Sequence, residues 1–276
     1  MLGAIIGDLA GSIYEYDDIK SVKRNIDRRK EVLKKDNLID KDSFYSDDTI
    51  LTIAILDAIL DGRPYEEVLR EYGLKYYQDE PNTKANHFKY MFSPEFIKWC
   101  KGETEGDSMG NGALMRVSPI GYLFNDLESV LEETEKATIP SHDSALAIVS
   151  AQSLNTLIYM GRKGYSKESM KPKFYPFGKS LDKIRLTNRF DSSCLVFDNC
   201  LTAFFESNSF EEAVRNAVSL GGDTDTVGAI TGSLAEAYYG VPEELKNQAL
   251  EKLPNDFVLK LENGYQKVKK LWYNYQ

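Results

Sequence analysis

Glycine recurs every fourth residue near the start of this chain. Gly3, Gly7 and Gly11 lie in residues 3–16, where the spacing of isoleucine and leucine predicts a helix. Residues four apart share one face of a helix, so these glycines form a stripe that carries no side chains. Because such a stripe is suited to close contact with a second helix, it favours a fold in which helices pack on helices.

Helical periodicity extends through most of the remaining sequence. Residues 223–239 carry Gly228 and Gly232, again four apart, so a second tightly packed helix is expected there. No segment is predicted to be a β-strand. The sequence therefore predicts an all-α fold, arranged as one compact multi-helix domain over residues 1–276. Further helices are expected at residues 47–61, 65–78, 96–101, 127–136, 143–161, 193–206, 210–219, 243–253 and 256–272.

Three segments interrupt this pattern. Residues 79–112 contain Pro, Gly, Asn and Ser and are expected to be rich in loops. Residues 20–37 are strongly charged and predict an exposed loop or a solvated helix. Residues 162–190 are basic and aromatic and predict an excursion over the surface. The two basic segments are candidates for substrate contact, although such segments are more often solvated faces.

Composition excludes several classes of protein. The net charge is −9, which argues against general binding to nucleic acid or to an anionic membrane. No stretch approaches the roughly 20 apolar residues of a membrane span. The first residues lack a basic region and Asp8 interrupts their apolar run, so no signal peptide is expected. Three cysteines without CxxC spacing argue against disulfides and predict a reducing, cytoplasmic location.

Two acidic clusters directly precede apolar helices. The first is residues 46–49, Ser-Asp-Asp-Thr, and the second is residues 221–226, Gly-Gly-Asp-Thr-Asp-Thr. Asp, Ser and Thr are common helix N-caps, which alone explains one such cluster. Capping needs one acceptor side chain, however, and adjacent buried carboxylates repel one another unless they are neutralised. Hard divalent cations with oxygen ligands, Mg²⁺ or Mn²⁺, provide that neutralisation, and two clusters brought together could hold two ions.

Two further acids lie in the first predicted helix. Asp8 is unusual in an apolar, glycine-striped helix, and its simplest interpretation is a structural acid satisfied by N–H groups. Glu15 follows seven residues later, about two turns along the same face. Alone, Glu15 would be a surface acid, whereas beside a metal pair it could act as general acid or base.

A glycine-rich stretch and a histidine are weaker signals. Residues 108–112, Ser-Met-Gly-Asn-Gly, enter an apolar run, and a turn of this type can present N–H groups to phosphate. A plain turn is the competing interpretation. His142 lies near a predicted helix start, where an N-cap with a neighbouring histidine is the simpler explanation.

Taken together, these segments resemble the ADP-ribosylglycohydrolase family. The resemblance is carried, in the family's order, by residues 3–15 (GAIIGDLAGSIYE), 45–49 (YSDDT), 110–116 (GNGALMR), 141–147 (SHDSALA) and 219–240 (SLGGDTDTVGAITGSLAEAYYG). It implies an all-helical domain with a binuclear Mg²⁺ or Mn²⁺ centre at the base of a cleft.

The resemblance also implies roles for individual residues. Glu15 matches the catalytic glutamate, and His142 matches a histidine that lines the ADP-ribose site. Phe190 is a candidate for stacking on adenine. The metal ligands implied are Ser46, Asp47, Asp48, Asp223, Asp225 and Thr226. The loop implied to hold the diphosphate and proximal ribose is Ser108, Met109, Gly110, Asn111 and Gly112.

The implied function is metal-dependent hydrolysis of the C1″ glycosidic bond between ADP-ribose and an acceptor, with a modified protein as partner and arginine as the favoured acceptor. A serine-type O-linked substrate is the first alternative. A non-catalytic ADP-ribose-binding relative and a metal phosphohydrolase acting on a nucleotide diphosphate are the others. The protein is expected to be a cytoplasmic monomer.

Overall fold

The chain forms a helical structure in a computed structural model that describes residues 1–15, 30–77, 92–175 and 178–273. Within these residues no β-strand forms, and isolated bridges pair Asp107 with His142 and Gly110 with Ser193. The helices are α1 (Leu2–Gly11), α4 (Asp47–Asp61), α5 (Tyr65–Lys75), α6 (Pro94–Cys100), α7 (Gly112–Arg116), α8 (Ser118–Leu123), α9 (Leu127–His142), α10 (Ala145–Arg162), α11 (Lys167–Phe174), α12 (Leu181–Thr187), η2 (Cys194–Val196), α13 (Phe197–Phe205), α14 (Phe210–Ser219), α15 (Thr224–Tyr239), α16 (Glu243–Glu251) and α17 (Asn255–Tyr273). The all-α prediction is confirmed.

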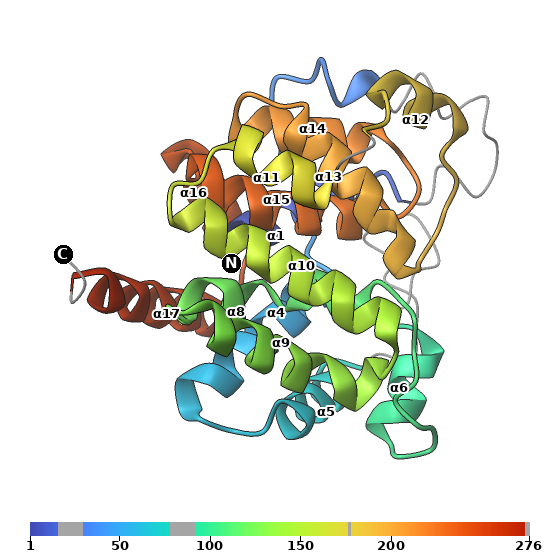
Figure 1. The fold of residues 1–276 in the computed structure, drawn as a ribbon. Coiled ribbons are helices and arrows are strands. Elements are labelled where there is room, and N and C mark those ends of the chain that lie inside the picture. The colour runs from blue at the N-terminus through green and yellow to red at the C-terminus, as the bar shows by residue number, and fades with distance from the viewer. Residues whose placement is uncertain (16–29, 78–91, 176–177, 274–276) are drawn as a thin grey trace.

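The helices form two groups separated by α10 (Figure 1). Helix α10 runs across the middle of this view, with α13, α14 and α15 on one side and α4, α5 and α9 on the other. It packs against both α9 and α15. Buried apolar side chains form a cluster that extends from Met1 to Leu261. No helix among the described residues is long and apolar enough to span a membrane.

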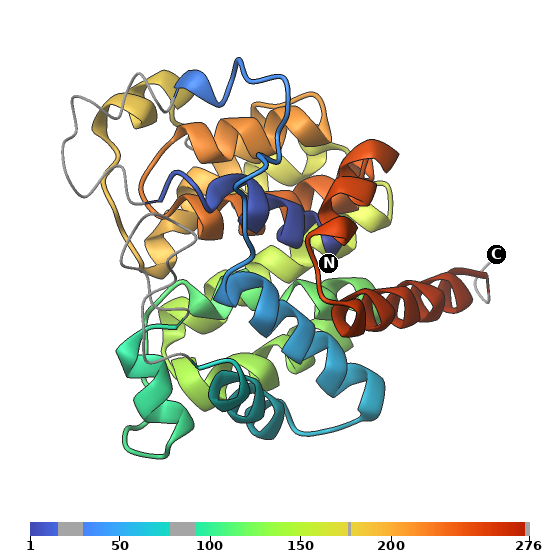
Figure 2. The ribbon, with the colours of Figure 1, turned by 180° about the vertical axis from the view of Figure 1, so that it is seen from behind.

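Helices α1 and α15 pack in closer contact than ordinary side chains allow. Figure 2 shows the two side by side. A Cβ atom added to Gly3 would overlap the carbonyl oxygen of Gly232, and one added to Gly7 would overlap that of Gly228. A Cβ on Gly11 would overlap the carbonyl oxygen of Thr224. Successive glycines along α1 contact residues that lie progressively earlier in α15, so the two helices are antiparallel. The glycine stripes that predicted tight packing face each other.

Several helix ends differ from the predictions. Helix α1 ends at Gly11 and not at residue 16. Ser12 is its C-cap, with the backbone N–H donated to the carbonyl of Asp8 and the hydroxyl donated to that of Leu9. Helix α9 continues to His142, although residue 136 was the predicted end, since Thr138 and Ser141 on this last stretch are buried. Residues 112–123 were not predicted to be helical, yet they form two short helices, α7 and α8.

Residues 162–190 lie mostly at the surface, as predicted, since most of those that the structure describes are exposed or half-buried. Helices α11 and α12 form there and bury Met170 and Ile184. Arg185 is also buried and donates hydrogen bonds to the side chains of Ser219 and Asn216. Arg185 also pairs with the exposed Asp182 at 3.0 Å, so the basic composition hid a partly inward face. Most of the charged segment 20–37 lies outside the described residues.

Candidate active site

The antiparallel pairing of α1 and α15 determines where Glu15 lies. The contacts step by four residues along each helix, from Gly3 to Gly11 on α1 and from Gly232 back to Thr224 on α15. Continuing beyond Gly11 brings the chain beside the loop that precedes α15. The close backbone packing therefore carries Glu15 to the acidic cluster of residues 221–226, which is far away in the sequence.

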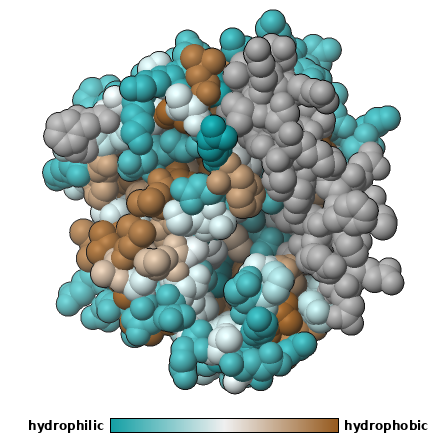
Figure 3. Space-filling model, turned by 90° about the vertical axis from the view of Figure 1, so that its right-hand side faces the viewer, coloured by the Kyte–Doolittle hydropathy of each residue, from teal (hydrophilic) through white to brown (hydrophobic). Residues whose placement is uncertain are grey.

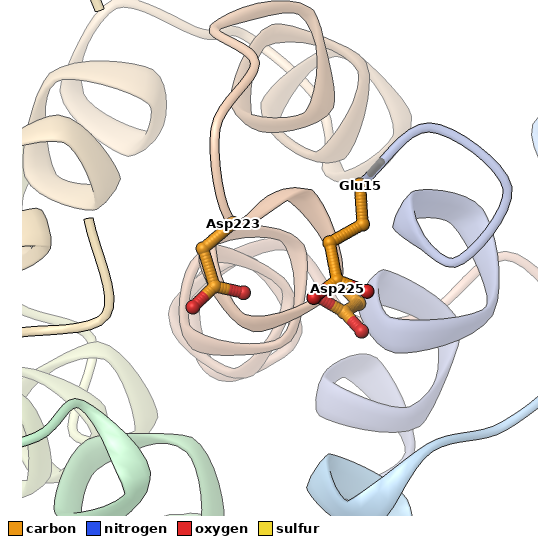
Figure 4. A group of neighbouring side chains, drawn as sticks. All are labelled: Glu15, Asp223 and Asp225. Atoms are coloured by element: carbon orange, nitrogen blue, oxygen red, sulfur yellow. The ribbon is translucent and has the colours of Figure 1, made fainter. Parts of the chain in front are cut away.

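Glu15, Asp223 and Asp225 form a buried group of carboxylates. One ligand oxygen of each lies within 4.8 Å of the others. In Figure 4, Glu15 reaches down from the segment after α1 to the carboxylate of Asp225, while Asp223 approaches from the start of α15. Three like charges in so small a buried volume repel one another, so the group requires neutralisation by protons or cations.

The first acidic cluster joins this group through the start of α4. Ser46 is the N-cap of α4, and its Oγ accepts a hydrogen bond from the backbone N–H of Asp48 at 3.2 Å. Oδ2 of Asp48 accepts hydrogen bonds from the hydroxyls of Ser46 and Thr226, each at 3.2 Å. Thr226 belongs to α15, so this contact brings the two clusters that precede apolar helices together.

Asp8 holds the start of α4 against α1. Its Oδ2 accepts hydrogen bonds from the backbone N–H groups of Ser46 at 2.9 Å and of Thr49 at 3.2 Å. These bonds to Oδ2, with a third from the Thr49 hydroxyl, agree with the interpretation of Asp8 as a structural acid. Through these bonds its carboxylate holds the start of α4, which carries Asp48, against α1.

The residues present fit a divalent cation. Oδ1 of Asp48 is buried and has no hydrogen-bond partner among the residues that the structure describes. Burial, followed by the charges of Asp225 and Asp8, raises the pKa of Asp48 well above its usual range. A buried carboxylate oxygen without a donor, surrounded by other carboxylates and hydroxyls, is the environment that a hard cation with oxygen ligands stabilises.

A cavity of about 790 Å³ opens over the carboxylates. Eleven of the residues proposed from sequence contribute to its lining, and Ser46 and Asp225 are buried outside the lining. Phe190 is 42% exposed and does not line the cavity. The proposed residues that line it are Glu15, Asp47, Asp48, Ser108, Met109, Gly110, Asn111, Gly112, His142, Asp223 and Thr226.

The glycine-rich loop is engaged with the rest of the protein. The backbone N–H of Gly110 donates to Oγ of Ser108 at 3.0 Å, and that of Asn111 donates to the carbonyl of Ser192 at 2.7 Å. The Asn111 side chain donates from Nδ2 to Oδ2 of Asp223 at 2.8 Å. The loop is therefore held beside the carboxylates, and two of the N–H groups expected to meet phosphate already have acceptors.

His142 lies beneath this loop as a neutral group. Its Nδ1 is 2.8 Å from Oγ of Ser141, which accepts a hydrogen bond from the buried Arg116. Burial, followed by the charge of Arg116, lowers the pKa of His142 well below its usual range. Burial also lowers the pKa of Arg116 to about 10. Both side chains contribute to the lining of the cavity.

Sequence reasoning missed part of the cavity lining. Phe92, Phe96 and Trp99 contribute to it, together with three exposed acids, Glu95, Glu105 and Asp107. The segment predicted to be rich in loops contains them, and its composition gave no sign that α6 would face the site. Arg116 and Ser141 were inside the quoted motifs but had been given no role.

Exposed hydrophobic side chains also occur near the loop. Met109 and Leu195 are exposed, and the backbone N–H of Cys194 donates to the carbonyl of Met109. Figure 3 shows one face of the molecule, on which brown hydrophobic patches interrupt a largely hydrophilic surface.

Comparisons with known proteins agree with this architecture. A model of the ADP-ribosylglycohydrolase family matches residues 1–271. Human ADP-ribosylhydrolase ARH3 is 22% identical over 318 residues, which cover 88% of this chain and 85% of that protein. ADP-ribosylarginine hydrolase Tri1 of Serratia proteamaculans is 24% identical over 222 residues, which cover 71% of this chain and 60% of Tri1.

A solved structure has the same fold. It is titled "ADP-ribosylglycohydrolase-related protein complex", and it superposes with a TM-score of 0.63 at 21% sequence identity. The match covers 97% of this chain and 93% of the other.

Proposed function

This chain belongs to the ADP-ribosylglycohydrolase family, and on that premise we propose that it hydrolyses the C1″ glycosidic bond between ADP-ribose and an acceptor. The observation that carries the proposal is the buried group of Glu15, Asp223 and Asp225, joined by Asp48, at a cavity of about 790 Å³. Small-molecule sites are concave and contain a few convergent polar groups, as this cavity does.

We propose that two divalent cations, Mg²⁺ or Mn²⁺, are bound by the clustered oxygens. When bound, such ions offset negative charge and lower the pKa of a water. The buried Asp48 oxygen without a donor supports this assignment. The proposed ligands are Ser46, Asp47, Asp48, Asp223, Asp225 and Thr226.

Glu15 is proposed as the catalytic group. Its carboxylate lies at the cavity and within reach of the Asp223 and Asp225 oxygens. In the proposed reaction a water adds to C1″ as the glycosidic bond breaks. Glu15 takes the proton from the water, and a proton passes to the departing acceptor. The products are intact ADP-ribose and the unmodified acceptor.

The remaining proposed contacts are with ADP-ribose. Residues 108–112 and His142 are proposed to hold the diphosphate and proximal ribose, and all of them line the cavity. Phe190 is exposed beyond the lining, and we propose that it stacks on the adenine where the ligand extends out of the cavity.

Arginine is the acceptor that we propose. The cavity lining includes three exposed acids, Glu95 at the start of α6 and Glu105 and Asp107 in the segment that follows it. Carboxylates recognise a guanidinium group well, because both are planar and can pair through two hydrogen bonds. Tri1, one of the relatives, is named an ADP-ribosylarginine hydrolase. A serine-linked substrate offers these acids no positive charge.

The experiment compares two peptides of one sequence, ADP-ribosylated on arginine in one and on serine in the other. Each is incubated with the protein and Mg²⁺ or Mn²⁺, and products are identified by mass spectrometry. The proposal predicts intact ADP-ribose from the arginine-linked peptide, and no product with chelator or with Glu15→Gln. Glu243→Gln, on the exposed start of α16, is the matched control and should retain activity.

Other outcomes identify the alternatives. Release from the serine-linked peptide alone would overturn the proposed acceptor. Release of AMP would indicate a phosphohydrolase. Binding of ADP-ribose by calorimetry without turnover of either peptide would indicate a non-catalytic relative.

We further propose that residues 1–276 act as one domain and as a monomer in the cytoplasm. The buried apolar cluster from Met1 to Leu261 supports a single unit. The three cysteines are free, buried thiols, which suits a reducing compartment.

A further inference from the structure

Arg116 is a fully buried arginine that no carboxylate neutralises within the described part of the chain. Its Nη2 donates to Oγ of Ser141 at 2.6 Å and to the carbonyl of Ala137 at 3.4 Å. Nε and Nη1 have no hydrogen-bond partner among the described residues. A guanidinium group is costly to bury in this state, so its one short bond to Ser141 indicates a role beyond packing.

The bond from Arg116 determines how the Ser141 hydroxyl is used. A guanidinium can only donate, whereas a hydroxyl has one proton and two lone pairs. Arg116 therefore occupies a lone pair of Oγ, and the hydroxyl proton needs an acceptor. In the described structure the other side-chain neighbour of this oxygen is Nδ1 of His142, at 2.8 Å. If Nδ1 carried a proton, the buried hydroxyl proton would have no acceptor there.

This arrangement selects one tautomer of His142. Nδ1 accepts from Ser141, so the single proton of the neutral imidazole lies on Nε2. That atom faces the glycine-rich loop: an ideal Cβ on Gly112 would lie 3.2 Å from Nε2, and one on Gly110 would lie 3.6 Å from it. The absence of side chains at these glycines leaves the Nε2–H open toward the cavity.

We propose that Arg116 and Ser141 are positioning residues that hold His142 as its Nε2–H tautomer, so that the cavity presents a fixed hydrogen-bond donor to an anionic ligand group. The identity of that group as the diphosphate of ADP-ribose rests on the proposed function. The N–H groups of Gly110 and Asn111 already have acceptors. A phosphate accepts only, so the other tautomer would turn a lone pair toward it.

The test is the tautomer itself, measured by ¹⁵N NMR of the imidazole in the ligand-free protein. The chain contains two histidines, and His87→Gln leaves the signals of His142 alone. We expect Nε2 protonated and Nδ1 unprotonated at neutral pH. A protonated Nδ1 in this protein would overturn the proposal, whether or not any substrate is hydrolysed.

Variants at Arg116 then test the cause. Arg116→Met keeps an apolar stem but removes the donor to Ser141 and to the carbonyl of Ala137. The Ser141 hydroxyl can then turn its proton to that carbonyl, four residues earlier in α9, and accept from Nδ1–H, so both tautomers become populated. Arg116→Lys keeps a donor and should restore the Nε2–H form. Arg162→Met removes another buried arginine, whose partners include the carbonyls of Gly121 and Phe124 and the side chain of Asn125, and should leave the tautomer unchanged. An unchanged tautomer in Arg116→Met would overturn the role of Arg116.

Calorimetry with ADP-ribose links the tautomer to binding. The dissociation constant for ADP-ribose should increase by the reciprocal of the fraction of His142 in the Nε2–H form. The increase is about twofold when the two tautomers are equally populated. Affinity that is retained in Arg116→Met despite a mixed tautomer would overturn the role toward the ligand. If Arg116→Met does not fold, Ser141→Ala with Ser141→Thr as rescue makes the same comparison. Wild-type protein in the Nε2–H form that binds no ADP-ribose would contradict the proposed function and leave the positioning role standing.

Discussion

Asn111 donates a hydrogen bond from its side-chain amide to Oδ2 of Asp223 at 2.8 Å. The two residues come from different parts of the site: Asn111 from the glycine-rich loop, and Asp223 from the cap of α15. The backbone of Asn111 is fixed separately by its bond to Ser192. The loop that is proposed to hold ADP-ribose is thus also a support for a proposed cation ligand.

Asn111→Ala is expected to weaken divalent-cation affinity roughly 10- to 100-fold, the usual cost of removing a group that orients a metal ligand. The reason is that Asp223 loses the donor that fixes its carboxylate. Calorimetric titration of the chelator-treated protein with MnCl₂ measures the effect. Asn125→Ala is the matched control, because Asn125 donates its side-chain bond to the carbonyl of Leu271 and does not line the cavity. Equal cation affinities for both variants and wild type would contradict the prediction.

Asp48→Asn should separate the stability of the protein from its response to cations. The variant keeps the shape of the side chain and removes one charge from the buried cluster. We expect a higher melting temperature than wild type in chelator at neutral pH, and a smaller increase when Mg²⁺ or Mn²⁺ is added. Thermal unfolding with and without each cation measures both effects.

Asp42→Asn is the control for that comparison, since Asp42 is exposed and outside the cluster. It should behave as wild type in both conditions. A wild-type response to cations in Asp48→Asn would remove Asp48 from the proposed ligands.

The raised pKa of Asp48 also predicts how stability depends on pH. Burial holds the folded-state pKa well above 3.8, while the unfolded chain keeps the ordinary value. The contribution of protonated Asp48 to the stability of the folded protein is therefore fully present below pH 3.8, and it is lost as pH rises through the folded-state pKa. Over that range the free energy of unfolding should decrease by at most about 1.4 kcal/mol per pH unit. Urea unfolding in chelator from about pH 4 to 8 should show a shallower decrease for Asp48→Asn; parallel curves would contradict the assignment.

Local patterns in the sequence predicted most of the helices because periodicity reports which face of a helix is buried. Helices at 47–61 and 210–219 have the predicted bounds. The two clusters could be named as candidate ligands because adjacent carboxylates before apolar helices are unusual for capping alone. The stripe at Gly3, Gly7 and Gly11 predicted close packing but did not identify the partner.

The rest of the site depends on contacts that no local pattern encodes. The antiparallel register of α1 against α15, which brings Glu15 to Asp225, is a property of two helices more than 200 residues apart. The hydrogen bonds that connect Arg116 to His142 join α7 and α9. Amino-acid composition does not show that a basic residue such as this arginine is buried. The loop N–H groups were expected to meet phosphate, but Gly110 donates to the Ser108 hydroxyl and Asn111 to the carbonyl of Ser192, which lies far away in the sequence.

Gly7→Ala tests whether the antiparallel register of α1 against α15 positions the carboxylates of the site. The new Cβ would overlap the carbonyl oxygen of Gly228, which belongs to a backbone that cannot move aside cheaply. We expect the free energy of unfolding to decrease by about 1–3 kcal/mol, the usual cost of overpacking. Because the helices must separate, Glu15 should move away from Asp225, and Mn²⁺ affinity should fall as well. Urea unfolding and calorimetry measure the two effects on one preparation.

Gly62→Ala distinguishes lost register from a general loss of stability. No atom lies within 4 Å of a Cβ at Gly62, but its φ of +66° strains any residue with a side chain. The expected cost is about 1 kcal/mol of unfolding free energy, with Mn²⁺ affinity unchanged because α4 ends there, far along the helix from Asp48. If both variants lost stability and neither lost cation affinity, the contact between α1 and α15 would be a matter of packing alone, and the position of Glu15 would need another cause.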